Sequence, residues 1–83
     1  MSDAKQTNKQ TNYLFTYQDA LKKLTPREIE VLDLVERGFT NKEIALEMSL
    51  SIHTVKTHRK NIHSKLDLKG RNALIKWLWW SRK

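Results

Sequence analysis

The sequence predicts an all-α fold in which four or five short helices surround one core. Apolar residues recur with helical spacing in several separate stretches, and most of these stretches begin with a hydroxyl residue that can cap a helix. Nowhere do apolar and polar residues alternate as they do in a half-buried strand. A chain of 83 residues can bury one small core, so we expect a single domain without a large catalytic pocket.

Composition narrows the classes of partner. The chain carries 16 lysines and arginines against 9 acidic residues, a net charge of +7, which suits a polyanion such as DNA, RNA or an anionic membrane surface. It has no cysteine, which excludes disulfides and thiolate zinc sites and fits a reducing cytoplasm. The first residues lack the apolar stretch of a signal peptide, and no apolar run approaches the roughly 20 residues that span a bilayer. We therefore expect a cytoplasmic protein without a membrane partner.

The N-terminal part divides into two segments. Residues 1–12 are polar, with almost nothing to bury, and we expect a flexible tail there. Residues 13–24 form a short helix or a linker, with Tyr13 and Phe15 packing beside it. Thr16 and Asp19 are placed to cap that helix. Its apolar residues follow the spacing i, i+3, i+4, i+7: Tyr17, Ala20, Leu21 and Leu24.

The first core helix has the clearest start and end signals, at the beginning of a domain that we place at residues 25–80. Thr25, Pro26 and Glu28 combine a capping threonine, a proline suited to the first helical position and a glutamate that completes a capping box. The helix should run to about Arg37, because Gly38 is well placed as the left-handed residue that ends it.

Three further helices complete the domain. Thr40 and Glu43 form a second capping box before a helix of about two turns, which buries Ile44, Ala45 and Met48. Ser51 can cap a third helix, whose apolar residues share one narrow sector of the helical wheel: Ile52, Val55, Ile62 and Leu66. A fourth helix is expected over about residues 71–80. The second and third helices, joined by a tight turn, match the helix-turn-helix pattern, which generic helical hairpins also fit.

The outward face of the third helix carries donors, and no acid interrupts it. The wheel places five side chains opposite the apolar stripe: His53, Lys56, Thr57, Lys60 and Ser64. Lysine can donate to guanine acceptors, and threonine offers a hydroxyl and a methyl, so we expect Lys56, Thr57 and Lys60 to contact base edges. A solvated basic face is the alternative. Arg59 lies near the apolar stripe, so its stem should cover the core edge while its head reaches solvent.

Phosphate-contacting residues are expected beside that face. Thr54, His58, Asn61 and Lys65 flank it, where a groove-seated helix passes near the DNA backbone. The start of the second helix, at Thr40, Asn41 and Lys42, also favours phosphate, although ordinary capping explains Thr40 equally well.

The sequence offers no case for catalysis, metal or cofactor. His53, His58 and His63 are spaced by five residues, about 140° apart on a helix, and cannot converge on one ion. The acids are explained by capping and by solvated faces, and neither a Gly-rich loop nor a Ser/His/Asp arrangement is present.

Three motifs carry a resemblance to a known family: LTPRE at residues 24–28, GFTNKEIA at 38–45, and the stretch from Ser51 to Leu66 containing TVKTH at 54–58. Over about residues 23–78 the chain resembles the LuxR-type (GerE/NarL/FixJ-like) helix-turn-helix domain. The resemblance implies a four-helix fold whose third helix enters the major groove. It implies base contacts by Lys56, Thr57 and Lys60. It also implies backbone contacts by these residues: Thr54, His58, Lys65 and Lys69, with Asn41 and Lys42 in addition. Gly70 departs from the family's usual Ser or Asn, which removes a side-chain cap from the fourth helix.

The protein is predicted to form a homodimer through the fourth helix. The resemblance implies dimerisation through this helix on a pseudo-palindromic site, with half-sites about one DNA turn apart. The residues themselves agree, because the helix is apolar all round and needs a second surface to bury against. Leu74, Trp77 and Leu78 can face the core, which leaves other sides to the predicted dimer residues: Ile75, Trp79 and Trp80. Alternatively, the tryptophans fold back over the domain or, with Lys76, Arg82 and Lys83, touch a membrane surface.

We therefore expect sequence-specific binding of double-stranded DNA by a bacterial transcriptional regulator or its C-terminal DNA-binding domain, associated with the nucleoid when bound. An upstream signalling domain or protein outside this chain is a further expected partner. The alternative is a protein-interaction module that docks through residues 13–24 and the tryptophan helix. Single-stranded RNA binding is disfavoured because the aromatic residues are not interleaved with the basic face.

Overall fold

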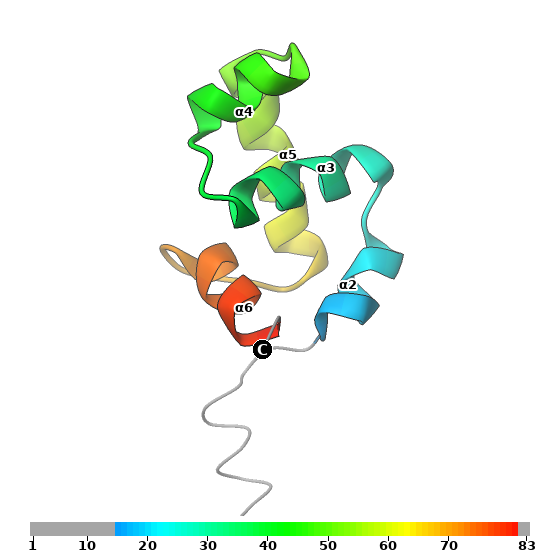
Figure 1. The fold of residues 1–83 in the computed structure, drawn as a ribbon. Coiled ribbons are helices and arrows are strands. Elements are labelled where there is room, and N and C mark those ends of the chain that lie inside the picture. Colours follow the sequence, from blue (N-terminus) through cyan, green and yellow to red (C-terminus); the bar gives the residue numbers. More distant parts are fainter. Residues whose placement is uncertain (1–14, 82–83) are drawn as a thin grey trace, which may run out of the picture.

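The computed structural model of the chain describes residues 15–81, in which five helices and no strands occur (Figure 1). The helices are α2 (Tyr17–Lys23), α3 (Pro26–Glu36), α4 (Asn41–Met48), α5 (Ile52–Lys65) and α6 (Ala73–Ser81). The all-α prediction is confirmed, and the short N-terminal helix is present as α2. The tail expected at residues 1–12, together with Tyr13, lies outside the described residues.

The predicted caps define where the helices start. Thr16, Thr25, Thr40 and Ser51 each accept a backbone N–H from three residues ahead, and both expected capping boxes are complete. In the second box, Thr40 N–H donates to Glu43 Oε1 at 2.8 Å while Glu43 N–H donates to Thr40 Oγ1 at 3.1 Å. Gly38, with φ of +92°, follows the end of α3, as the sequence predicts.

The turn between α4 and α5 contains a left-handed serine that the sequence does not predict. Ser49 has φ of 58° and ψ of 44°, and the N–H of Leu50 donates to the carbonyl of Ala45 at 2.8 Å. This backbone reversal sends the chain directly from α4 into α5. A side chain at this conformation costs about 1 kcal/mol relative to glycine.

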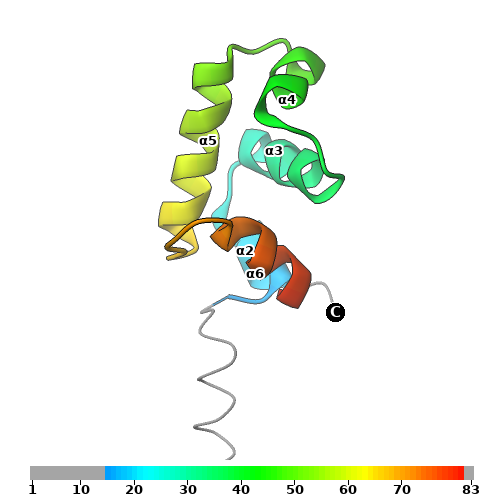
Figure 2. The same ribbon diagram turned by 90° about the vertical axis from the view of Figure 1, so that its left-hand side faces the viewer.

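The core lies where α5 packs against both α3 and α4 (Figure 2). Val31 and Leu32 of α3, Ile44 of α4 and Val55 and Ile62 of α5 are fully buried there. Ile44, Val55 and Ile62 belong to the helical stripes that the sequence predicts.

One residue of the predicted apolar stripe of α5 is exposed instead of buried. Ile52 was expected to be buried, yet 41% of it is exposed. It occupies the first position of α5, so the apolar sector extends into the exposed start of the helix.

The fourth core helix begins later than expected. We expected a start near Arg71, whereas α6 begins at Ala73. Asn72 has φ of 61°, which is incompatible with a right-handed helix and keeps Arg71 in the connecting turn. Gly70, with φ of +96°, occupies a conformation that strains residues with side chains, so glycine there serves the turn.

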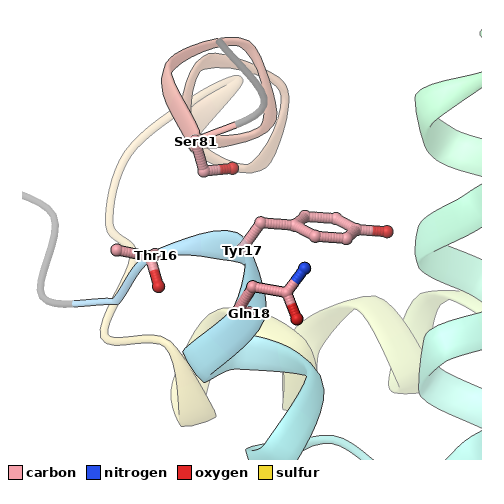
Figure 3. A pocket seen from close by; sticks show the side chains of 4 residues that line it. All are labelled: Thr16, Tyr17, Gln18 and Ser81. Atoms are coloured by element: carbon pink, nitrogen blue, oxygen red, sulfur yellow. The ribbon is translucent and has the colours of Figure 1, made fainter.

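Helix α2 packs beside α6 and closes the bottom of the core (Figure 1). Tyr17 stacks on Trp77 with ring centroids 6.1 Å apart, and Trp77 Nε1 donates to the carbonyl of Phe15 at 2.8 Å. A shallow pocket of about 400 Å³ lies between the start of α2 and Ser81 at the end of α6. Figure 3 shows the side chains that line it. Because of the contacts with Trp77, α2 packs as part of the same core although it precedes the predicted domain start at residue 25.

Candidate nucleic-acid interface

Helix α5 lies at one edge of the molecule, and one of its sides faces away from the other helices (Figure 2). Lys56, Thr57 and Lys60 are exposed, as the helical wheel predicts, and so are His53 and Ser64. The helix contains no acidic residue. Its outer side is therefore an uninterrupted surface of cationic and hydroxyl groups.

The three predicted base-contacting side chains are not used by the fold. Within residues 15–81, Lys56, Thr57 and Lys60 form no hydrogen bond or ion pair with the protein. Lys56 and Lys60 lie one helical turn apart, a rise of about 6 Å. Their ammonium groups and the Thr57 hydroxyl are thus available as donors to an acceptor-rich surface.

The N-terminus of α5 holds Thr54 in a defined hydrogen-bonding arrangement. Ser51 Oγ donates to Thr54 Oγ1 at 2.9 Å and accepts the Thr54 backbone N–H at 3.0 Å. Because Thr54 Oγ1 acts as the acceptor of this pair, its own hydroxyl hydrogen remains to donate outward. A phosphate oxygen is a suitable acceptor for that hydrogen.

The N-terminus of α4 is linked to α5 through Arg59. The guanidinium Nη1 of Arg59 donates to Asn41 Oδ1 at 3.0 Å. Burial lowers the pKa of Arg59, although a guanidinium stays charged at neutral pH. Arg59 is half-buried, and its head binds α4 through one nitrogen, a contact that the sequence does not predict.

Lys65 is engaged at the opposite end of α5. Its ammonium lies 2.8 Å from Glu28 Oε1, which also accepts the N–H of Thr25 at 2.9 Å. Burial raises the pKa of Glu28, but the hydrogen bonds from Lys65 and Thr25 outweigh it, and the net pKa is lowered. Glu28 caps α3 as predicted, but it is only 3% exposed and is not on a solvated face.

The remaining predicted phosphate contacts differ in exposure. Lys42 and Lys69 are exposed, and His58 is half-buried.

His63 buries its Nε2, and its pKa is lowered by burial and by the nearby Arg59 charge. Among residues 15–81 no group of three His, Cys, Asp or Glu side chains could hold a metal ion.

The outer side of α6 exposes apolar side chains together with Lys76. Leu74, Trp77 and Leu78 are buried as expected, while 51% of Ile75 and 75% of Trp79 are exposed. Trp80 is half-buried and packs against the core, so it offers only part of its surface to any partner. Within the described part of the chain, no helix has both the length and the apolar character needed to cross a membrane.

Comparison with known proteins gives one matching family and several similar regulators. Residues 22–78 match the family described as "Bacterial regulatory proteins, luxR family". The chain is 41% identical over 59 residues to the oxygen regulatory protein NreC of Staphylococcus haemolyticus, an alignment that covers 71% of this chain and 27% of that protein. It is 56% identical over 48 residues to the transcriptional regulatory protein LiaR of Bacillus subtilis, an alignment that covers 58% of this chain and 23% of that protein. The aligned part thus spans about a quarter of the length of these relatives.

Proposed function

The chain belongs to the luxR family of bacterial regulatory proteins, and on that premise we propose that α5 enters the major groove of double-stranded DNA and reads its sequence. The observation that carries this proposal is the exposed, acid-free outer side of α5, where Lys56, Thr57 and Lys60 are unused by the fold. Lysine donates to guanine O6 and N7, and threonine contacts adenine or the thymine methyl. These three side chains therefore supply the sequence preference.

Contacts to the DNA backbone fix how α5 sits in the groove. Thr54, His58, Asn41, Lys42 and Lys69 supply them in this proposal. Asn41, Lys42 and Thr54 lie in the first turns of α4 and α5, His58 lies near the middle of α5, and Lys69 follows its end. The Lys65 ammonium has two further hydrogens beyond the one directed at Glu28, and these would make its phosphate contact.

We propose that the regulator acts as a homodimer on a pseudo-palindromic site. The exposed apolar surface formed by Ile75 and Trp79 on α6 supports this state, and Trp80 contributes its outer part. Two such domains would place their reading helices about 34 Å apart, one turn of DNA. In sedimentation experiments on DNA, Trp79→Ser should convert two bound copies to one. Leu46→Ser, at a residue 74% exposed on α4, is the matched control and should leave two copies bound.

The names of the relatives support a role in transcriptional control, and we propose that a domain or protein outside this chain supplies the signal. A second candidate, a protein-interaction module, is favoured by the exposure of Trp79. Duplex DNA added to labelled protein separates the two candidates. DNA binding predicts chemical-shift changes at Lys56 and Lys60, whereas a protein-interaction module predicts none there.

Selection of bound duplexes from a random pool tests the proposal directly. Affinity for the selected site should fall about a thousandfold between 50 and 200 mM salt if about six phosphates are contacted. Lys56→Ala and Thr57→Ala should relax the sequence preference, whereas Lys69→Ala should weaken all duplexes equally. A wild-type protein that binds selected and random duplexes with equal affinity would remove the proposed reading function.

A further inference from the structure

The contact between Arg59 and Asn41 joins residues 18 positions apart in the sequence and ties the reading helix to the start of α4. Both side chains are half-buried. Arg59 makes no ion pair with a carboxylate among residues 15–81, unlike Arg27, Arg37 and Lys65. Holding a half-buried guanidinium on a neutral amide stabilises a fold less than pairing it with a carboxylate does. The placement therefore points to a role beyond folding.

The contact fixes which way the Asn41 amide faces. Because Oδ1 accepts from the guanidinium, the Nδ2 amino group must point to the other side, since a reversed amide would set donor against donor. Asn41 is the first residue of α4. The capping box already uses the N–H groups of Thr40 and Glu43. The backbone N–H groups of Asn41 and Lys42 have no acceptor inside the helix, so the first turn of α4 offers these two donors in addition to Nδ2.

We propose that Arg59 is a positioning residue for DNA binding, which holds Asn41 so that its Nδ2 donates to a backbone phosphate, without touching DNA itself. This inference rests on the proposed function. It assigns a role to an arginine that lies on α5 but off its reading face. It also makes the Arg59–Asn41 bond the element that sets the phosphate contact of α4 relative to the base contacts of α5.

Salt dependence separates this role from a direct contact. An arginine that neutralises a phosphate releases a counterion, and its removal lowers the slope of log K against log salt by about 0.9. A neutral amide releases none. Arg59→Met keeps most of the aliphatic part of the side chain and removes the guanidinium group. It should weaken binding to the selected duplex roughly tenfold and leave the slope of log K against log salt unchanged.

A double variant tests whether Arg59 and Asn41 act through the same contact. Asn41→Ala should cost the same roughly tenfold, and Arg59→Met combined with Asn41→Ala should cost no more than either single change. Losses that multiply in the double variant would overturn the proposal, as would a salt slope reduced by about 0.9 in Arg59→Met, which would show that Arg59 binds phosphate itself.

Asn41→Asp separates positioning from stability. The aspartate keeps an acceptor for Arg59, so the midpoint temperature of thermal unfolding should be at least as high as in the wild type. Its carboxylate repels phosphate, so the affinity for the selected duplex should fall more than tenfold. Unchanged binding by Asn41→Asp would refute the proposal even if Arg59→Met fails to fold. Wild-type protein that ignores duplex sequence would instead refute the proposed function, and the two failures are therefore distinguishable.

Discussion

Replacing Lys65 with methionine tests the link between the end of α5 and the start of α3. The Nζ to Oε1 distance is 2.8 Å, the Glu28 side chain is 4% exposed and the Lys65 side chain is 36% exposed. Breaking a fully buried pair costs about 3–5 kcal/mol, and an exposed pair contributes about 0–1 kcal/mol. With one partner buried and the other screened by solvent, we expect Lys65→Met to lower the free energy of unfolding by about 2 kcal/mol at pH 7.

The cost should depend on pH, because it arises from a charged carboxylate. The folded-state pKa of Glu28 is lowered, so the pair's contribution is present above the ordinary glutamate pKa of about 4.3 and is lost as the pH falls through the folded value. Without Lys65, burial still opposes the Thr25 hydrogen bonds, so the Glu28 pKa of the variant lies above that of the wild type. The difference in unfolding free energy between wild type and variant should therefore narrow as the pH falls through the Glu28 pKa of the variant and then through the lowered pKa of the wild type.

Urea unfolding followed by circular dichroism, repeated from pH 7 down to pH 3, measures this difference. Lys60→Met is the matched control on the same helix, because Lys60 is exposed and unused by the fold, and it should stay within about 0.5 kcal/mol of wild type. A Lys65→Met cost equal to that of the control at pH 7, or one that persists undiminished at pH 3, would refute the reasoning.

Three further changes test local features of the fold. Thr40→Ala removes the acceptor of the Glu43 N–H and should cost about 1 kcal/mol in urea unfolding; no loss would mean that the capping box is not stabilising. Trp77→Phe loses the 2.8 Å bond to Phe15, so amide hydrogen exchange should accelerate through α2, and unchanged protection would contradict that role. Ser49→Gly should raise the free energy of unfolding by about 0.5–1 kcal/mol, because it relieves a left-handed residue; destabilisation would show that the serine is unstrained.

The elements that sequence reasoning predicts well are those with local causes. Thr25 and Thr40 each accept the backbone N–H three residues ahead, and Gly38 directly follows the end of a helix, so each signal lies within a few adjacent positions. The exposure of Lys56 and Lys60 follows equally directly, because a helix with one apolar stripe has only one other side.

The features that it misses depend on how separate helices meet. The Arg59–Asn41 and Lys65–Glu28 contacts join residues 18 and 37 positions apart, and periodicity says nothing about which helix ends lie side by side. The burial of Ile52 is overestimated for the same reason, because a wheel gives the direction of a side chain and not the place where the covering helices stop.

The separation of reading side chains from structural ones has a consequence for how such a protein can change. The side chains of Lys56, Thr57 and Lys60 form no hydrogen bond or ion pair within residues 15–81, while Arg59 and Lys65 on the same helix hold it to α4 and α3. Mutational drift at the three outer positions therefore leaves stability nearly untouched. New target preferences can accumulate there by neutral steps, and a combinatorial library restricted to these positions will consist largely of folded proteins.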